Sequence, residues 1–83
     1  MRGLKNSFKR KTQDMESSIN IRDEFIKLGQ AMKLAGLADS GVEAKIFIEE
    51  GRVKVNGEEE LRRGRKLYKG DSFSFGGNTV TVE

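Results

Sequence analysis

A dense group of cations lies in the segment LRRGRKLYKGD, residues 61–71. Arginine presents a planar group that matches the oxygens of a phosphate, and its guanidinium can also stack on exposed bases. Gly64 allows the backbone to approach a ligand closely, and Tyr68 offers a further stacking surface. The segment therefore has residue types suited to binding an anion. Its five cations are Arg62, Arg63, Arg65, Lys66 and Lys69.

The same cations are also compatible with a solvated turn that balances its own charge. Three glutamates, residues 58–60, stand directly before the basic segment. Exposed ion pairs contribute only about 0–1 kcal/mol each, so pairing alone explains the clustering poorly. From residue types alone, anion binding and local charge balance remain open alternatives.

Catalytic chemistry has little support in this composition. The 83 residues include no cysteine and no histidine, which excludes disulfides, thiolate metal sites and the commonest general base. The acidic residues are scattered or fall in the 58–60 triplet, so they do not suggest a pair of catalytic carboxylates. We expect a protein that is not an enzyme and that uses no cofactor, no metal and no small-molecule substrate.

The excess positive charge is confined to one end of the chain. Residues 1–20 contain five Lys/Arg and two Asp/Glu, whereas residues 21–83 contain eleven of each. Only a local cluster can therefore argue for a nucleic-acid partner. The uncharged runs are too short to span a bilayer, and the basic N-terminal segment lacks the apolar stretch of a secretory signal. We expect a cytoplasmic monomer that makes no membrane contact.

The sequence divides into a leader and one small domain. Residues 1–20 have few large apolar side chains and no sustained period, which predicts a basic, disordered leader. An alternative start at Met15 would remove all five of its cations. Residues 21–83 predict a single domain that begins with a short strand over 24–28 and a helix over 30–37.

A second helix has clear signals at both ends. The segment SGVE, residues 40–43, predicts a capping box in which Ser40 accepts a backbone N–H and Glu43 reaches back. Ala44, Phe47 and Ile48 follow at helical spacing and should face a core. Gly51 is well placed to end the helix in the left-handed conformation.

Strands are predicted after this helix. Residues 52–55, 72–75 and 79–83 alternate in polarity, and Asn56-Gly57 together with residues 76–78 predicts two hairpins. Phe73 and Phe75, like Phe47, match buried positions better than base-stacking positions. The expected fold class is α+β, with two short helices packed on one face of a small, mainly antiparallel sheet.

Residues 29–71 resemble the RNA-binding domain named after ribosomal small-subunit protein four. The resemblance is carried by the pair Ala44-Lys45, by Ile48, by EGRVKVNG at 50–57 and by KGD at 69–71. The combination of SGVEAK with RRGRKLYKGD is similar to the stand-alone, single-domain bacterial members of this family.

The resemblance implies the fold known as the αL motif and a non-catalytic role in binding structured RNA, either ribosomal RNA or tRNA. Many members have basic residues where this chain has Gly41, Val42 and Ile46, so the expected contacts shift towards the 62–69 segment.

A protein-interaction adaptor, whose basic loop meets an acidic partner, is the alternative. Convergence of the cations on the face that holds Lys45 would favour RNA. The residues expected to contact RNA are Arg62, Arg63, Arg65, Lys66, Lys45, Lys33, Lys69 and Tyr68.

Overall fold

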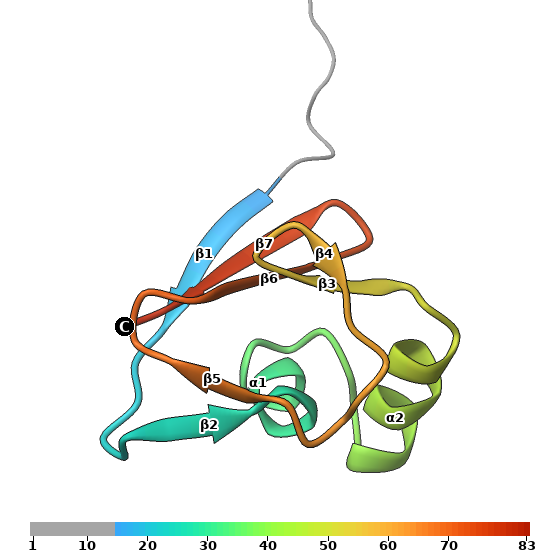
Figure 1. Cartoon of the computed structure of the whole chain (residues 1–83), viewed down its shortest axis with the longest axis horizontal. Helices are drawn as coiled ribbons and strands as arrows, with labels where there is room; N and C mark the ends of the chain where they lie inside the picture. Colours follow the sequence, from blue (N-terminus) through green and yellow to red (C-terminus); the bar gives the residue numbers. More distant parts are fainter. Residues whose placement is uncertain (1–14) are drawn as a thin grey trace, which may run out of the picture.

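The computed structural model describes residues 15–83, and these form seven strands and two helices (Figure 1). In chain order the elements are β1 (Met15–Ile19), β2 (Phe25–Lys27), α1 (Leu28–Leu34), α2 (Gly41–Glu49), β3 (Val53–Val55), β4 (Glu58–Glu59), β5 (Lys66–Tyr68), β6 (Ser72–Phe75) and β7 (Asn78–Val82).

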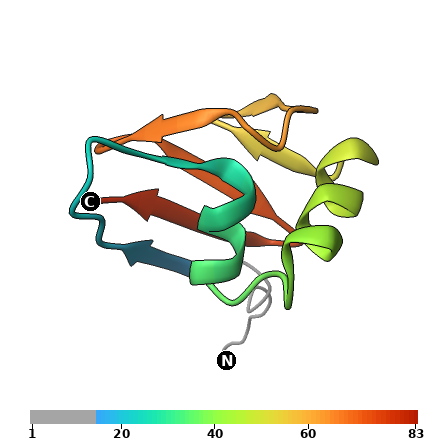
Figure 2. The ribbon, with the colours of Figure 1, turned by 90° about the horizontal axis from the view of Figure 1, so that it is seen from below.

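The strands form two sheets. Five of them make a mixed sheet in the order β1-β7-β6-β3-β4, in which β1 runs parallel to β7 and the other pairs are antiparallel. The remaining two, β2 and β5, pair as a separate antiparallel ribbon. Both helices lie on the same side of the larger sheet, with α2 towards one end (Figures 1 and 2). The predicted α+β fold, two helices on one face of a mainly antiparallel sheet, is confirmed.

The core lies between the larger sheet and the helices. Phe73 is 1% exposed and is a core residue, as predicted. Phe47 and Phe75 are only half-buried: their rings stack with centroids 4.6 Å apart at the edge of the core, and Arg52 lies over both rings. The largest fully buried side chains are Phe73, Leu28, Met32, Ile48, Leu67, Val53, Val80 and Val82.

The predicted ends of α2 are confirmed, with one difference at its start. Ser40 Oγ accepts the backbone N–H of Glu43 at 3.1 Å, but the Glu43 carboxylate accepts the N–H of Asp39, at 2.8 Å, instead of that of Ser40. At the other end Gly51 has φ +77°. The N–H of Arg52 reaches back to a carbonyl of the last helical turn, the bonding pattern of a Schellman motif.

Both predicted hairpins are present. Asn56 and Gly57 have φ values of 52° and 87° between β3 and β4, and Gly76 and Gly77 have φ values of 59° and 86° between β6 and β7. Two consecutive residues with positive φ form the tight turn whose twist matches paired antiparallel strands. These local signals placed the two turns correctly.

The prediction of a disordered leader over residues 1–20 is wrong for residues 15–19. These residues form β1, which pairs in parallel with β7, and Ile19 is only 7% exposed. The pairing joins segments from opposite ends of the sequence, and one large buried apolar side chain gave too weak a local signal. Residues 1–14, which hold the five leader cations, lie outside the described residues. No helix within residues 15–83 is long and apolar enough to cross a membrane.

Candidate nucleic-acid interface

The basic segment is attached by its backbone to the start of α1. The first N–H groups of a helix have no partner within the helix, and the side chain of Lys27, at the N-cap, supplies none. The carbonyls of Arg65 and Arg63 accept the N–H groups of Leu28 and Gly29, at 2.8 and 3.0 Å. Residues 62–65 are thereby held against α1, although the two segments are far apart in the sequence.

This attachment brings three cations around one hollow, here called the basic depression, with a volume of about 370 Å³. The cations come from three elements: Lys27 from β2, Lys33 from α1 and Arg63 from the loop before β5. Among residues 15–83, no acidic residue lines it. Its lining residues are Lys27, Gly29, Gln30, Lys33, Gly41, Arg63 and Gly64.

Gly29 permits the close approach of Arg63 to α1. A Cβ atom added at Gly29 would lie 2.8 Å from Cγ of Arg63, closer than real Cβ atoms approach other heavy atoms. The aliphatic part of the Arg63 side chain therefore packs against the backbone of α1 at Gly29, and this contact restricts the position of its guanidinium group. A larger residue at position 29 would force the arginine or the loop to move.

Lys45 lies on the face of α2 that adjoins the basic depression. It is exposed and follows Gly41 by four residues, and Gly41 lines the depression. Residues four apart share a helix face, and a helical side chain leans towards the N-terminus. Lys45 is therefore on the same side of α2 as Gly41, but it is not one of the residues that line the depression.

Two of the predicted arginines are held by a buried carboxylate. Glu60 is 7% exposed, and its oxygens accept hydrogen bonds from Arg62 Nε at 2.9 Å and from Arg65 at 2.7 Å. The Arg62 backbone N–H also donates to it, at 3.1 Å. The hydrogen bonds from Arg62, more than offsetting the burial of the carboxyl, lower the pKa of Glu60 to about 2. The same contact raises the pKa of Arg62.

The idea of a self-neutralised turn is thus correct for two cations only. Arg62 and Arg65 share the single charge of Glu60, so this cluster keeps a net positive charge. Within residues 15–83, Glu58 and Glu59 form no ion pair, and neither do Arg63 and Lys66. Local pairing leaves the basic depression uncompensated.

Lys66 and Tyr68 lie on β5, beside a second hollow of about 590 Å³, here called the tyrosine depression. It is lined by Arg62, Gly64, Arg65, Lys66 and Tyr68, and it shares Gly64 with the basic depression. Lys69 lies elsewhere: it follows the far end of β5, where the N–H of Gly70 donates to Val82 of β7. Neither depression includes Lys69, so the structure gives no support to its inclusion in the site.

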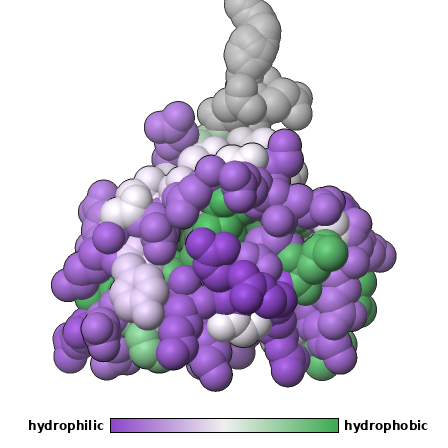
Figure 3. All heavy atoms as spheres, in the orientation of Figure 1, coloured by the Kyte–Doolittle hydropathy of each residue, from purple (hydrophilic) through white to green (hydrophobic). Residues whose placement is uncertain are grey.

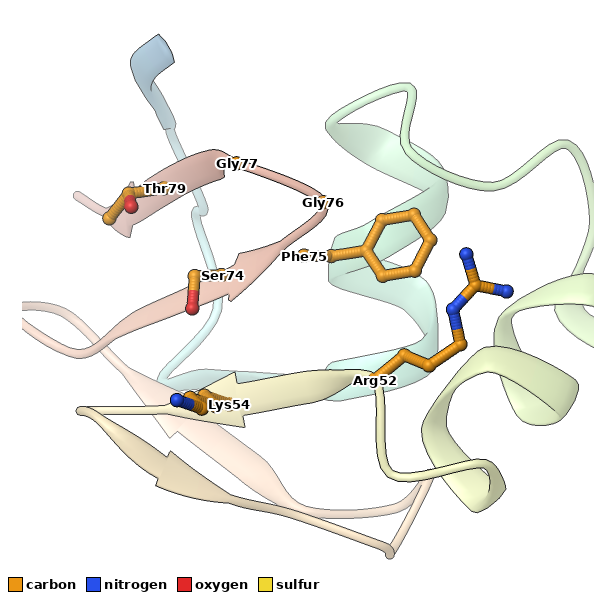
Figure 4. A pocket seen from close by; sticks show the side chains of 7 residues that line it. All are labelled: Arg52, Lys54, Ser74, Phe75, Gly76, Gly77 and Thr79. Carbon is orange, nitrogen blue, oxygen red and sulfur yellow. The ribbon is translucent and has the colours of Figure 1, made fainter. Parts of the chain in front are cut away.

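A further hollow, of about 300 Å³, lies on the larger sheet near the β6–β7 turn (Figure 4). Its two cations do not converge. Arg52 lies beside the ring of Phe75 and pairs with Glu50 at 3.3 Å, whereas Lys54 projects further along the sheet near Ser74 (Figure 4). This hollow is a weaker candidate for an anion than the basic depression.

Comparison with known proteins identifies the family. The sequence matches the S4 domain over residues 19–83. This chain belongs to the S4 domain family. It is 49% identical over 63 residues to the probable ribosome maturation protein RlbA of Bacillus subtilis, with 76% of this chain and 89% of RlbA covered.

A solved structure supports the same assignment. YbcJ of Escherichia coli is 44% identical over 57 residues, with 69% of this chain and 81% of YbcJ covered. Its solution structure superposes with a TM-score of 0.60 at 36% identity, covering 93% of this chain and 98% of YbcJ. That structure is described as containing an αL motif involved in RNA binding. The predicted resemblance is therefore confirmed, and the family is one of binding domains, not of enzymes.

Within this S4 domain, sequence reasoning found part of the basic depression and missed part. Lys33 and Arg63 were predicted, but Lys27 and Gln30 were not. Alternation along residues 24–28 could have placed Lys27 on an exposed face, but its proximity to Arg63 depends on the pairing of β2 with β5. Among residues 15–83 no group of three or more Asp or Glu side chains could hold a metal ion.

The face of the S4 domain that is seen in the orientation of Figure 1 is largely hydrophilic (Figure 3). Hydrophobic atoms on this view form separate small areas, with no broad continuous patch (Figure 3). Such a surface suits a polar, charged ligand better than an apolar one.

Proposed function

We propose that this S4 domain binds structured RNA by docking phosphates in the basic depression. The observation that carries the proposal is the convergence of Lys27, Lys33 and Arg63 on one hollow without an acidic residue in its lining. Lysine and arginine side chains bind phosphate oxygens, and such contacts hold RNA without reading its bases. Shape would then dominate over base sequence, as for folded or double-stranded RNA.

We propose ribosomal RNA or tRNA as the target; the relatives support RNA in general, and the name of RlbA favours ribosomal RNA. RlbA is named as a probable ribosome maturation protein, and the αL motif of YbcJ is described as involved in RNA binding. With this target we propose a non-catalytic, monomeric protein of the cytoplasm, where ribosomal RNA and tRNA are located in bacteria. The proposal requires no cofactor and no small-molecule substrate.

A pair of charge-matched variants tests the proposal. Lys33→Ala/Arg63→Ala removes two cations of the basic depression and leaves the contacts of Glu60 with Arg62 and Arg65 intact. Lys54→Ala/Lys69→Ala removes the same charge from exposed positions outside it. Binding to a fluorescent ribosomal RNA fragment and to a tRNA is measured over a salt series, after circular dichroism shows that each variant is folded.

The first variant should lose affinity for both RNAs, and its salt-dependence slope should fall by about two units because each lysine or arginine on a phosphate accounts for about one. The control should bind with nearly the wild-type slope. Equal affinity of the two variants would contradict the proposal.

A protein-interaction adaptor, whose basic loop meets an acidic partner, is the second candidate, and an exposed apolar pair on α2 favours a protein contact. Val42 and Ile46 are 69% and 47% exposed, and they lie four residues apart on one helix face. Val42→Ser/Ile46→Ser should leave RNA binding intact if RNA is the partner of the basic depression. The adaptor would be favoured by two results together: the basic depression does not bind RNA, and the wild type binds a protein partner that Val42→Ser/Ile46→Ser does not bind.

A further inference from the structure

The outer face of the β2–β5 ribbon combines aromatic and cationic side chains. Register places Phe25 opposite Tyr68 and Lys27 opposite Lys66. Directly opposite residues of an antiparallel pair share one face. Leu67 of the intervening pair is fully buried, so the face that carries these four side chains points away from the core.

A contribution to fold stability explains the two aromatic residues of this face but not its two lysines. The rings of Phe25 and Tyr68 lie 5.9 Å apart, a cross-strand aromatic contact that stabilises a ribbon. The two lysines do the opposite, because like charges directly across a strand pair are destabilising. Within residues 15–83 neither forms an ion pair. The Lys66 ammonium lies 4.7 Å from the centre of the Phe25 ring, a contact that orients it but does not cancel its charge.

Tyr68 is held in place but remains open. It is 44% exposed, one side of its ring contacts Phe25, and its hydroxyl has no hydrogen-bond partner among the described residues. It borders the tyrosine depression, which is also lined by Lys66, by Gly64 and by the two arginines that share Glu60. A fixed, accessible ring beside several cations is the arrangement with which proteins bind unpaired nucleotides: the base stacks on the ring and the phosphate meets the cations.

The two depressions share Gly64 as a lining residue, and a Cβ added there would meet no atom within 4 Å, so no side chain stands between them at this point. An RNA whose phosphates occupy the basic depression can therefore continue over Gly64 towards Tyr68. Lys27 lines the first hollow and faces Lys66 of the second across the ribbon.

We propose that the tyrosine depression takes an unpaired nucleotide, with its base stacked on Tyr68 and its phosphate held by Lys66, while Lys27, opposite Lys66 on the ribbon, holds the phosphates of the basic depression. This inference rests on the proposed function and deepens it. The RNA it predicts has a folded or double-stranded part in the basic depression and an unpaired nucleotide directly beside that part.

The test compares an RNA hairpin with a blunt end and the same hairpin with a short unpaired extension, placed at the 5′ end in one probe and at the 3′ end in another. The wild-type protein should prefer at least one extended hairpin. In Tyr68→Leu the ratio of the affinity for the preferred extended hairpin to the affinity for the blunt hairpin should fall about ten-fold, because stacking of a base on an aromatic ring is lost. Tyr68→Phe keeps the ring and should keep the preference.

A second measurement does not depend on how well a variant folds. The fluorescence of 2-aminopurine in the extension should be quenched when the wild-type protein binds, since the base becomes stacked. Absence of quenching in both extended probes, an affinity ratio near one for the wild type, or equal ratios in wild type and Tyr68→Leu would each overturn the inference. Loss of the preference in Tyr68→Phe would also overturn it, because the hydroxyl and not the ring would then be responsible. Failure of the RNA-binding proposal is a separate result, namely equal affinities of Lys33→Ala/Arg63→Ala and its charge-matched control.

Discussion

At the scale of single residues, Glu60 organises the basic segment. Its carboxylate is buried, and the guanidinium groups of Arg62 and Arg65 donate to it. The sequence offered three consecutive glutamates with nothing to distinguish them. The distinction arises from the fold, because the N–H of Glu60 bonds to Val53 where β4 ends, and its side chain turns inwards.

We expect Glu60→Gln to lower the free energy of unfolding by about 1–2 kcal/mol at neutral pH, because hydrogen bonds to a charged group are lost. The effect is no larger because Arg62 is largely exposed, and solvent weakens its interaction with Glu60. The folded-state pKa of about 2 lies below the ordinary value of 4.5. The stabilisation is therefore complete above about pH 5 and is lost as the pH falls towards 2.

Urea unfolding at a series of pH values checks this prediction. Wild type should lose part of its stability between pH 5 and pH 2, and Glu60→Gln should lack that part of the dependence. Glu58→Gln, at an exposed position that forms no ion pair within residues 15–83, is the matched control and should follow the wild type. Identical pH profiles for all three proteins would contradict the assignment.

At the scale of elements, the contact between α1 and the loop before β5 builds the basic depression. Sequence signals predicted α2, its caps and two hairpins, since each depends on residues close together in the chain. The β2–β5 ribbon was not predicted, because a pairing between residues about forty positions apart has no local signature. For this reason Lys27 was missed, although Lys33 and Arg63 were identified.

The fit between Gly29 and Arg63 gives a prediction at this scale. Gly29→Ala should displace the Arg63 side chain, because the added methyl would lie 2.8 Å from its Cγ. Stability should change by about 1 kcal/mol or less, since alanine also favours the helix. Affinity for the RNA probes should fall roughly three- to ten-fold.

A double-mutant cycle shows whether the effect passes through the arginine. In the Arg63→Ala background, Gly29→Ala should cause no further loss of affinity, because the side chain it displaces is absent. The measurement is RNA affinity for the four proteins at one salt concentration. Additive losses would mean that Gly29 acts on binding by another route.

At the scale of the whole molecule, the distribution of charge matters more than its sum. Residues 21–83 contain equal numbers of acidic and basic residues, yet the lining of the basic depression contains only the basic kind. The fold separates the two signs: Glu60 is buried beneath its arginines, and the lining cations come from three different elements. No count of charges along the chain could have located this surface.

The two ends of the described chain meet in the larger sheet, and this gives the last prediction. β1 adds in parallel to β7, the final strand, and Ile19 is its one buried large side chain. Ile19→Ala should lower the free energy of unfolding by about 2 kcal/mol, at the low end for a buried isoleucine because β1 is an edge strand. Ser18→Ala, at an exposed position of the same strand, should have little effect.

Urea unfolding measures both variants, and hydrogen exchange supplies independent evidence. Backbone pairing with β7 should protect amides of residues 15–19, and the N–H of Met15, bonded to Gly77 at 2.9 Å, should be among them. If β1 is an integral strand, Ile19→Ala should weaken this protection together with that of β7, because the two strands share one cooperative unit. Unprotected amides over 15–19, with equal stability of the two variants, would instead restore the prediction of a disordered leader that reaches to residue 20.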